Sequence, residues 1–479
     1  MGNRVRVTAR LIDTRSGAQE WAETYQREVA DVFDLQSDLA QAIVAQLEAK
    51  ILPSERREIE NPMTRDLTAY DAFLRGRQLV EGYLDQADQK SALLKAVTYF
   101  EEAIVRDPAF ALAFCYAAEA HDILFSNGLD ASPARLRLAE NALAAALRLQ
   151  PNSPEAHLAL ADHYFRCYLD SNRAQVELEL ARPGLPNSPS FYMLSGNVSR
   201  RQGRWEEGEN EFTKAVELDP RNPNAVNYLA DTQVLRRRFP EAIQTYERAA
   251  QVGLDSPVLR IRIAVIKFAA QGDVTALENT LAAEPADLDV GGGETPLRVL
   301  VALIRNNPEG ASKALAASPR IDFQDVDFSF YYPRSWYEAL IARAVGNREQ
   351  ERTSLVAARS VLEERLKNKP HNRTRAVLAE VDAGLGSQEL AIHEGLSALE
   401  AAPPSQDAYE APLVKQALAQ VYLLCGDKEH ALQLVEELVR IPGYLSYGYL
   451  ALDPAWAPLR AEPRFRALVT SLAEGAGVR

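Results

Sequence analysis

The sequence predicts a mostly helical protein, an α-α superhelical solenoid, with a small α/β segment of one hairpin and one helix at its amino end. Three observations predict this fold class. Small, aromatic and proline residues recur at a spacing of 34 residues. The amino end instead alternates between polar and apolar residues. The chain of 479 residues is 47% hydrophobic and 25% charged, a composition typical of folded proteins.

The amino end reads as two strands followed by a helix. Residues 4–12 alternate polar and apolar side chains, residues 14–17 supply a turn, and residues 19–25 form a second strand. Leucine or isoleucine then recurs every fourth position over 35–47, which predicts a helix from about Val32 to Ile51 with one apolar stripe. Two strands and one helix bury little core, so we expect this piece to pair with something further.

The edge of the first strand offers one such pairing. Its backbone groups over 5–11 have a single predicted neighbour in the chain, and an exposed strand edge is a template for another strand. A homodimer through the amino-terminal strands is therefore one expected assembly.

The best-preserved repeat runs from Pro189 to Pro220. Small residues at three positions let two helices approach closely, an aromatic residue fills the space between them, and proline ends the second helix. These anchors are Gly196, Gly208, Phe212, Ala215 and Pro220, and the next repeat places Ala230, Ala242, Tyr246 and Ala249 at the same spacing. Five weaker copies have their anchors within 96–108, 139–151, 174–186, 379–403 and 419–438.

These residues resemble the tetratricopeptide repeat family, in which each unit is a helix, a turn and a helix. The resemblance covers roughly 67–283 and 372–441. No repeat carries the family's full set of Trp, Leu, Gly and Tyr in its first helix, and the first two repeats have long insertions between their helices. The resemblance implies a concave surface formed by the first helices.

A second resemblance concerns the two ends of the chain. Residues 4–47 are similar to the last strands and helix of a TolB-like α/β module, and residues 452–469 are similar to the tail of the same bacterial signalling proteins. In that family an effector often stands upstream: a protein kinase, a nucleotide cyclase or a winged-helix domain. Relative to the family, we expect this chain to be truncated at its start.

The predicted domain organisation has five parts. Between the two repeat blocks, GGGETP and a cluster of aromatic residues break the period, although a divergent repeat with a long loop is an alternative. The parts are a partial TolB-like module (1–60), a first solenoid block (61–285), an irregular link (286–334), a second helical block (335–445) and a capping tail (446–479).

Composition argues against several classes of partner and compartment. The 53 basic and 67 acidic residues give a formal charge of −14, which disfavours binding to nucleic acid or to anionic lipid. We find no apolar run of the ~20 residues that a membrane span needs and no signal peptide, so we expect a cytoplasmic protein, or an extracytoplasmic one if an upstream membrane segment is missing. Cys115, Cys167 and Cys425 suggest reduced core residues.

No motif predicts a catalytic, metal or cofactor site. His157 and His163 are six residues apart, which places them on different sides of a helix. The glycines at 291–293 precede ETP rather than Lys-Ser or Lys-Thr, so they read as a link rather than a phosphate loop. No GxSxG nucleophile elbow is present.

The remaining candidate is the concave groove. The repeat frame points eight polar or flexible side chains into it, although such residues could also simply be solvated. Asparagines can hydrogen-bond a peptide backbone, and two adjacent arginines can pair with an acidic side chain, so charge reversal at both arginines should weaken capture of a partner without changing stability. The predicted groove residues are Ser190, Met193, Asn197, Arg200, Arg201, Asn224, Asn227 and Asp231.

The sequence therefore favours a non-enzymatic protein-interaction scaffold that holds a partner protein or peptide in its groove. The alternative is the regulatory or sensory arm of a bacterial signalling enzyme or transcription regulator whose effector lies upstream or on another chain. An enzyme acting in the groove is a third alternative, and it would need buried, mutually close ionisable groups at the groove floor.

Overall fold

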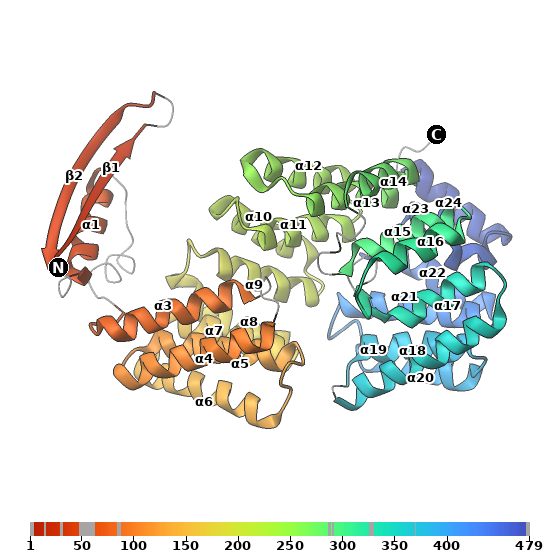
Figure 1. The fold of residues 1–479 in the computed structure, drawn as a ribbon, viewed down its shortest axis with the longest axis horizontal. Coiled ribbons are helices and arrows are strands. Elements are labelled where there is room, and N and C mark those ends of the chain that lie inside the picture. Colours follow the sequence, from red (N-terminus) through yellow and green to blue (C-terminus); the bar gives the residue numbers. More distant parts are fainter. Residues whose placement is uncertain are drawn as a thin grey trace. The chain divides into compact units, whose positions relative to one another are not determined.

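The computed structural model describes residues 4–13, 16–28, 32–46, 63–83, 88–285, 289, 292–324, 330–368 and 370–475. It divides into two compact units, Met1–Pro186 and Asn187–Arg479 (Figure 1). Part of the expected first turn (14–15), the expected end of the first helix (47–51) and one residue of the glycine run (291) lie outside the described residues. The expected five-part boundaries remain predictions.

The amino end of the first unit is a two-stranded ribbon followed by a helix, as predicted. Strand β1 (Arg4–Ile12) pairs antiparallel with β2 (Gln19–Glu28), which is longer than the expected second strand. Helix α1 (Val32–Gln46) follows, and its Phe33 ring lies edge-on to Tyr70 with ring centroids 5.3 Å apart. Among the described residues β1 pairs only with β2. The resemblance of this segment to a TolB-like module is not confirmed.

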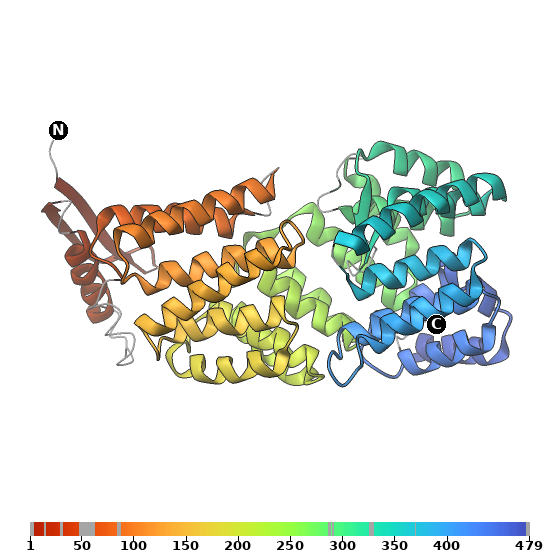
Figure 2. The same ribbon diagram turned by 90° about the horizontal axis from the view of Figure 1, so that it is seen from below.

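Antiparallel helix pairs make up the rest of the first unit (Figure 2). Asp66, Ser132 and Ser153 cap helix starts by accepting hydrogen bonds from backbone N–H groups of the first turn. The helices are α3 (Leu67–Glu81), α4 (Gln89–Arg106), α5 (Ala111–Ser126), α6 (Pro133–Leu149), α7 (Pro154–Cys167) and α8 (Ser171–Ala181), followed by the 3₁₀ turn η3 (Arg182–Gly184).

The second unit begins with four further helix pairs. Ser188 and Asn222 cap α9 and α11, and proline occupies the first helical position of both helices. The elements are α9 (Pro189–Arg201), α10 (Trp205–Leu218), α11 (Pro223–Leu235), α12 (Phe239–Ala249), η4 (Ala250–Leu254), α13 (Pro257–Gln271), α14 (Val274–Ala283), α15 (Glu294–Ile304) and α16 (Pro308–Ala317).

The remainder of the second unit is a short hairpin followed by more helix pairs. The expected irregular link thus contains the pair α15 and α16 as well as the hairpin, as in the divergent-repeat alternative. The elements are β3 (Asp322–Gln324), β4 (Tyr331–Pro333), α17 (Arg334–Ala344), α18 (Arg348–Asn368), α19 (Asn372–Gly384), α20 (Gln388–Glu400), α21 (Glu410–Leu424), α22 (Lys428–Leu438), α23 (Tyr447–Leu452), η6 (Pro454–Leu459) and α24 (Pro463–Gly475).

The predicted anchors do pack between paired helices. A Cβ added to Gly196 would lie 2.7 Å from the ring of Phe212, and Phe212 is fully buried. Tyr246 fills the same position in the next repeat with 3% exposure. Gly76 and Phe100 repeat the arrangement in the first unit, where an added Cβ would lie 2.6 Å from the ring. The mostly helical solenoid with a small amino-terminal sheet is confirmed.

None of the described helices combines the length and the apolar character needed to cross a membrane.

Candidate functional site

The predicted groove residues lie on α9 and α11, but the structure divides them into two groups. Ser190 and Asn224, near the amino ends of these helices, are exposed. Met193, Asn197 and Asn227 are half-buried. Asn197 donates from its amide to the Met193 carbonyl at 2.9 Å, and the amide oxygen of Asn227 accepts from the Tyr246 hydroxyl at 3.2 Å.

The carboxyl-terminal ends of the same helices contact the chain itself. The Arg200 guanidinium, 6% exposed, lies 2.7 Å from an Asp231 carboxylate oxygen. It also lies over the Tyr409 ring, 4.4 Å from the centroid. Arg201 forms an ion pair with Asp407. The expectation that charge reversal at both arginines leaves stability unchanged is therefore wrong, because each guanidinium already neutralises a carboxylate of the folded unit.

Backbone hydrogen bonds hold the same late segments against α9 and α11. The Ala408 N–H donates to the Arg201 carbonyl at 2.7 Å, and the Gly443 N–H donates to the Leu235 carbonyl at 2.9 Å. Tyr444 donates its hydroxyl to Asp231. Segments about 200 residues apart in sequence thus close the second unit on itself, and this part of the concave face is already occupied.

Arg237 adds three side-chain hydrogen bonds to this closure. It occupies the position that Gly203 occupies one repeat earlier, and it adopts the same left-handed backbone with φ of 58°. That conformation costs a residue with a side chain roughly 1–2 kcal/mol. Its guanidinium donates to the backbone carbonyls of Leu438, Ile441 and Leu445 at 3.1, 2.6 and 3.2 Å.

The second unit also contains a cavity of about 590 Å³. This volume lies in the range of pockets that hold small molecules or anchoring side chains, roughly 300–1,000 Å³. Its lining comes from α15, β4, α17, α18, α19, α21, α23 and the turn η6, and most of it is apolar or aromatic. Lining residues include Val299, Leu303, Tyr332, Trp336, Leu340, Leu355, Ala417, Gln420, Tyr449 and Trp456.

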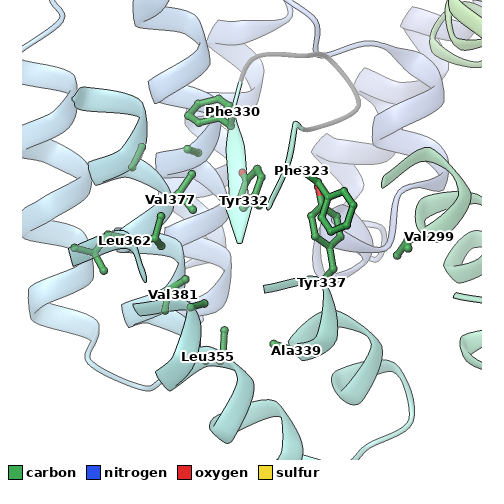
Figure 3. Close-up of a cluster of buried hydrophobic side chains, with 14 of the residues drawn as sticks. Val299, Phe323, Phe330, Tyr332, Tyr337, Ala339, Leu355, Leu362, Val377 and Val381 are labelled. Carbon is green, nitrogen blue, oxygen red and sulfur yellow. The ribbon is translucent and has the colours of Figure 1, made fainter. Parts of the chain in front are cut away.

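Aromatic side chains of β4 and α17 form one wall of this cavity. The rings of Tyr332 and Trp336 lie 4.1 Å apart, and Tyr337 packs edge-on against Trp336 at 4.9 Å. Figure 3 shows Tyr332 between Tyr337 on one side and Val377 of α19 on the other. Because aromatic rings bury a large area at little entropic cost, such a wall suits an apolar anchor.

Few polar groups reach the cavity. Glu380 is 3% exposed and accepts from the Tyr332 hydroxyl at 3.3 Å. Burial raises the pKa of Asp453 to about 6. Arg343 lies at the rim of the cavity and pairs at 2.6 Å with Glu351, a residue that does not line the cavity. Gln416 and Gln420 of α21 add amide groups. The cavity therefore combines a mostly apolar lining with two carboxyl groups, those of Glu380 and Asp453.

Sequence reasoning missed this cavity because its walls come from the helices whose repeat frame is least regular. One signal was available in the segment 330–337, where five of eight residues are aromatic. The structure also separates the two histidines weighed as metal ligands. His157 contacts Glu177 at 2.7 Å, whereas His163 contacts Asp122 at 2.8 Å.

Stacked helix pairs with this repeating contact define an α-α repeat protein. The tetratricopeptide repeat family model matches residues 194–256, so the chain contains tetratricopeptide repeats there. The fold is that of a protein-interaction scaffold, since stacked repeats present extended concave surfaces for partners.

Comparisons with known proteins cover parts of the chain. "Putative adenylate cyclase 3" from Rhizobium meliloti (strain 1021) is 36% identical over 78 residues, which is 16% of this chain and 13% of that protein. A tetratricopeptide repeat protein from Parabacteroides merdae is 16% identical, with a TM-score of 0.35, over 51% of this chain and 91% of its own. A thermophilic repeat protein from Thermus thermophilus is 20% identical, with a TM-score of 0.34, over 41% and 98% respectively.

Proposed function

We propose that the protein is a non-enzymatic interaction scaffold that holds a segment of a partner protein at the cavity of the second unit. The cavity carries this proposal. Its volume of about 590 Å³ and its aromatic wall suit the apolar anchor side chains that dominate the binding energy of peptide complexes.

The charge of the cavity defines the partner's chemistry more closely. Glu380 and Asp453 bring two carboxyl groups to a lining whose rim arginine is already paired with Glu351. The whole chain carries a formal charge of −14. Electrostatic complementarity therefore favours a segment with apolar anchors next to Lys or Arg. Amides such as those of Gln416 and Gln420 can both donate to and accept from a peptide backbone.

The predicted groove on α9 and α11 has a secondary role in this proposal. Ser190, Met193 and Asn224 would extend the contact surface for a longer partner. Arg200 and Asp231 would instead hold the second unit closed, so that the partner meets a preformed surface. A preformed surface leaves most of the ordering cost to the partner segment.

A photo-crosslinking experiment tests the proposal. Benzoylphenylalanine replaces Gln420, which lines the cavity, or Gln433, which is exposed on α22. The full chain is expressed in its own cells and irradiated. A discrete crosslinked product at position 420 that is absent at position 433 is expected, and mass spectrometry should place the link in a basic, apolar segment. Identical product patterns at the two positions would contradict the proposal.

A second candidate function is the regulatory arm of a signalling enzyme. The stretch of 36% identity to a protein named as an adenylate cyclase favours it, although that stretch spans only 13% of the relative. An antibody against the repeats would measure the mass of the native product. A species clearly above 53.0 kDa would support an additional effector, whereas a species at 53.0 kDa would count against one on the same chain.

Pairing of two copies through the free edge of β1 remains a prediction. Sedimentation of the full chain against one with Val7→Pro checks it, because proline removes a strand hydrogen-bond donor.

A further inference from the structure

Three potential metal ligands converge inside the first unit, whereas the groove residues and the cavity belong to the second unit. Asp122 lies on α5, and His163 and Cys167 lie on α7. Their ligand atoms all lie within 4.8 Å of one another. His163 and Cys167 are four residues apart, the spacing that places two side chains on the same face of a helix.

The contacts within this Asp-His-Cys cluster meet at one carboxylate oxygen. His163 Nδ1 lies 2.8 Å from Asp122 Oδ1, and Cys167 Sγ lies 3.3 Å from the same oxygen. Asp122 and His163 are each 1% exposed. His163 Nε2 is buried and has no hydrogen-bond partner among the described residues. A carboxylate, an imidazole and a thiol from two helices thus meet in one buried place, where polar groups normally need partners.

A cysteine nucleophile does not explain the arrangement. A catalytic thiol needs an imidazole nitrogen as its base, but Cys167 Sγ contacts the carboxylate of Asp122 instead. Burial also raises the pKa of the Cys167 thiol, which opposes formation of the reactive thiolate.

A bound divalent cation explains it better. Imidazole nitrogen, thiolate sulfur and carboxylate oxygen are the three ligand types of zinc sites, and tetrahedral zinc separates its ligand atoms by about 3.2–3.6 Å. The Sγ to Oδ1 distance of 3.3 Å already fits, and the Nδ1 to Oδ1 distance of 2.8 Å would need to open by about half an ångström. The imidazole nitrogen and Sγ lie within 4.8 Å of each other, so the bound metal would draw them together. Two positive charges would balance one carboxylate and one thiolate.

We propose that Asp122, His163 and Cys167 bind one zinc ion, which ties α5 to α7 in the first unit. The thiol proton is released when the thiolate ligates, and one imidazole nitrogen and one carboxylate oxygen complete the three protein ligands. The fourth position is left for water. Cys167 ends α7 and is only half-buried, so the metal has a route to the site through that end of the helix.

Cobalt binding to the purified full chain tests the site. Co²⁺ replaces zinc in tetrahedral sites and reports its ligands through visible bands and a near-ultraviolet thiolate charge-transfer band. After treatment with chelator, the wild type should bind one equivalent with both signals, and zinc should displace the cobalt. Cys167→Ser should abolish the thiolate band, and His163→Gln should weaken binding at least tenfold.

Two matched variants serve as controls. Cys425→Ser removes another half-buried thiol, and His157→Gln removes another histidine of α7, so both should bind cobalt as the wild type does. If Cys167→Ser does not fold, the double variant Cys115→Ser with Cys425→Ser leaves Cys167 as the sole thiol and must keep the band. A wild type without the band, or loss of the band in that double variant, would overturn the proposal.

Discussion

Replacing Arg200 by alanine should loosen the closure of the second unit. The change removes the ion pair to Asp231 at 2.7 Å, a hydrogen bond to Asn197 at 3.1 Å and the stacking on Tyr409 at 4.4 Å. It leaves the Asp231 carboxylate with Tyr444 as its other side-chain partner. The segment that carries Tyr409 then loses this stacking and keeps the ion pair between Asp407 and Arg201 of α9.

The expected loss of stability follows from the burial of the Arg200–Asp231 ion pair. Removing one partner of a buried ion pair costs about 3–5 kcal/mol. The Asp231 side chain keeps 23% exposure and can recover some hydration, so the lower end, about 3 kcal/mol, applies. Since 1.4 kcal/mol corresponds to a factor of ten, local protection should fall about 100-fold.

Hydrogen exchange on the full chain, read by mass spectrometry, measures this loss locally. This readout suits a repeat protein, because global unfolding of such arrays need not be two-state. Peptides covering α11, which carries Asp231, should exchange about 100-fold faster in Arg200→Ala. The control Arg305→Ala breaks the exposed pair with Glu278, which is worth about 0–1 kcal/mol, and should change little. Unchanged protection in Arg200→Ala would mean that the ion pair to Asp231 does not hold α11 against α9.

Three further predictions concern packing and pH. Gly196→Ala places a methyl group 2.7 Å from the Phe212 ring and should lower the free energy of unfolding by about 1–3 kcal/mol. Urea unfolding followed by circular dichroism should show a lower midpoint; an unchanged midpoint would mean that the two helices can move apart to accept the methyl group. Tyr246→Ala should cost about 3–5 kcal/mol in the same assay. Tyr246→Phe loses only the contacts of the hydroxyl, to Asn227 and Arg262, and should cost about 1 kcal/mol; equal losses would contradict the packing role. Burial lowers the pKa of His121 from 6.5 to about 4, so between these pH values the folded state binds fewer protons than the unfolded state. The neutral His121 therefore contributes about 3 kcal/mol to the free energy of unfolding above pH 6.5, and this contribution is lost as the pH falls to 4. His121→Asn should flatten the stability profile over that window, and a parallel profile would argue against the shift.

The repeat frame could be predicted because it reports contacts that are close in sequence. Gly196 and Phe212 belong to neighbouring helices of one repeat, so a glycine and an aromatic residue at fixed spacing are enough to indicate their contact. The strands at the amino end could be predicted for the same reason, because the alternation of polar and apolar residues over 4–12 is a local signal.

The closure of the second unit could not be predicted in this way. Arg237 meets the carbonyl of Ile441, 204 residues further along, and that encounter depends on the summed curvature of many helix pairs. For the same reason Arg200 and Arg201 looked available for a partner, although Tyr409 and Asp407 reach them from a loop just before α21. The cavity shares this origin, because its walls come from helices far apart in sequence.

The affinity of the crosslinked partner segment for the full chain tests whether the cavity holds the partner. Calorimetry would compare the wild type with Gln420→Trp, which fills the cavity, and Gln433→Trp, which adds the same side chain on the exposed face of α22. We expect at least tenfold weaker binding for Gln420→Trp and wild-type affinity for Gln433→Trp. Wild-type affinity in both variants would show that the partner binds elsewhere.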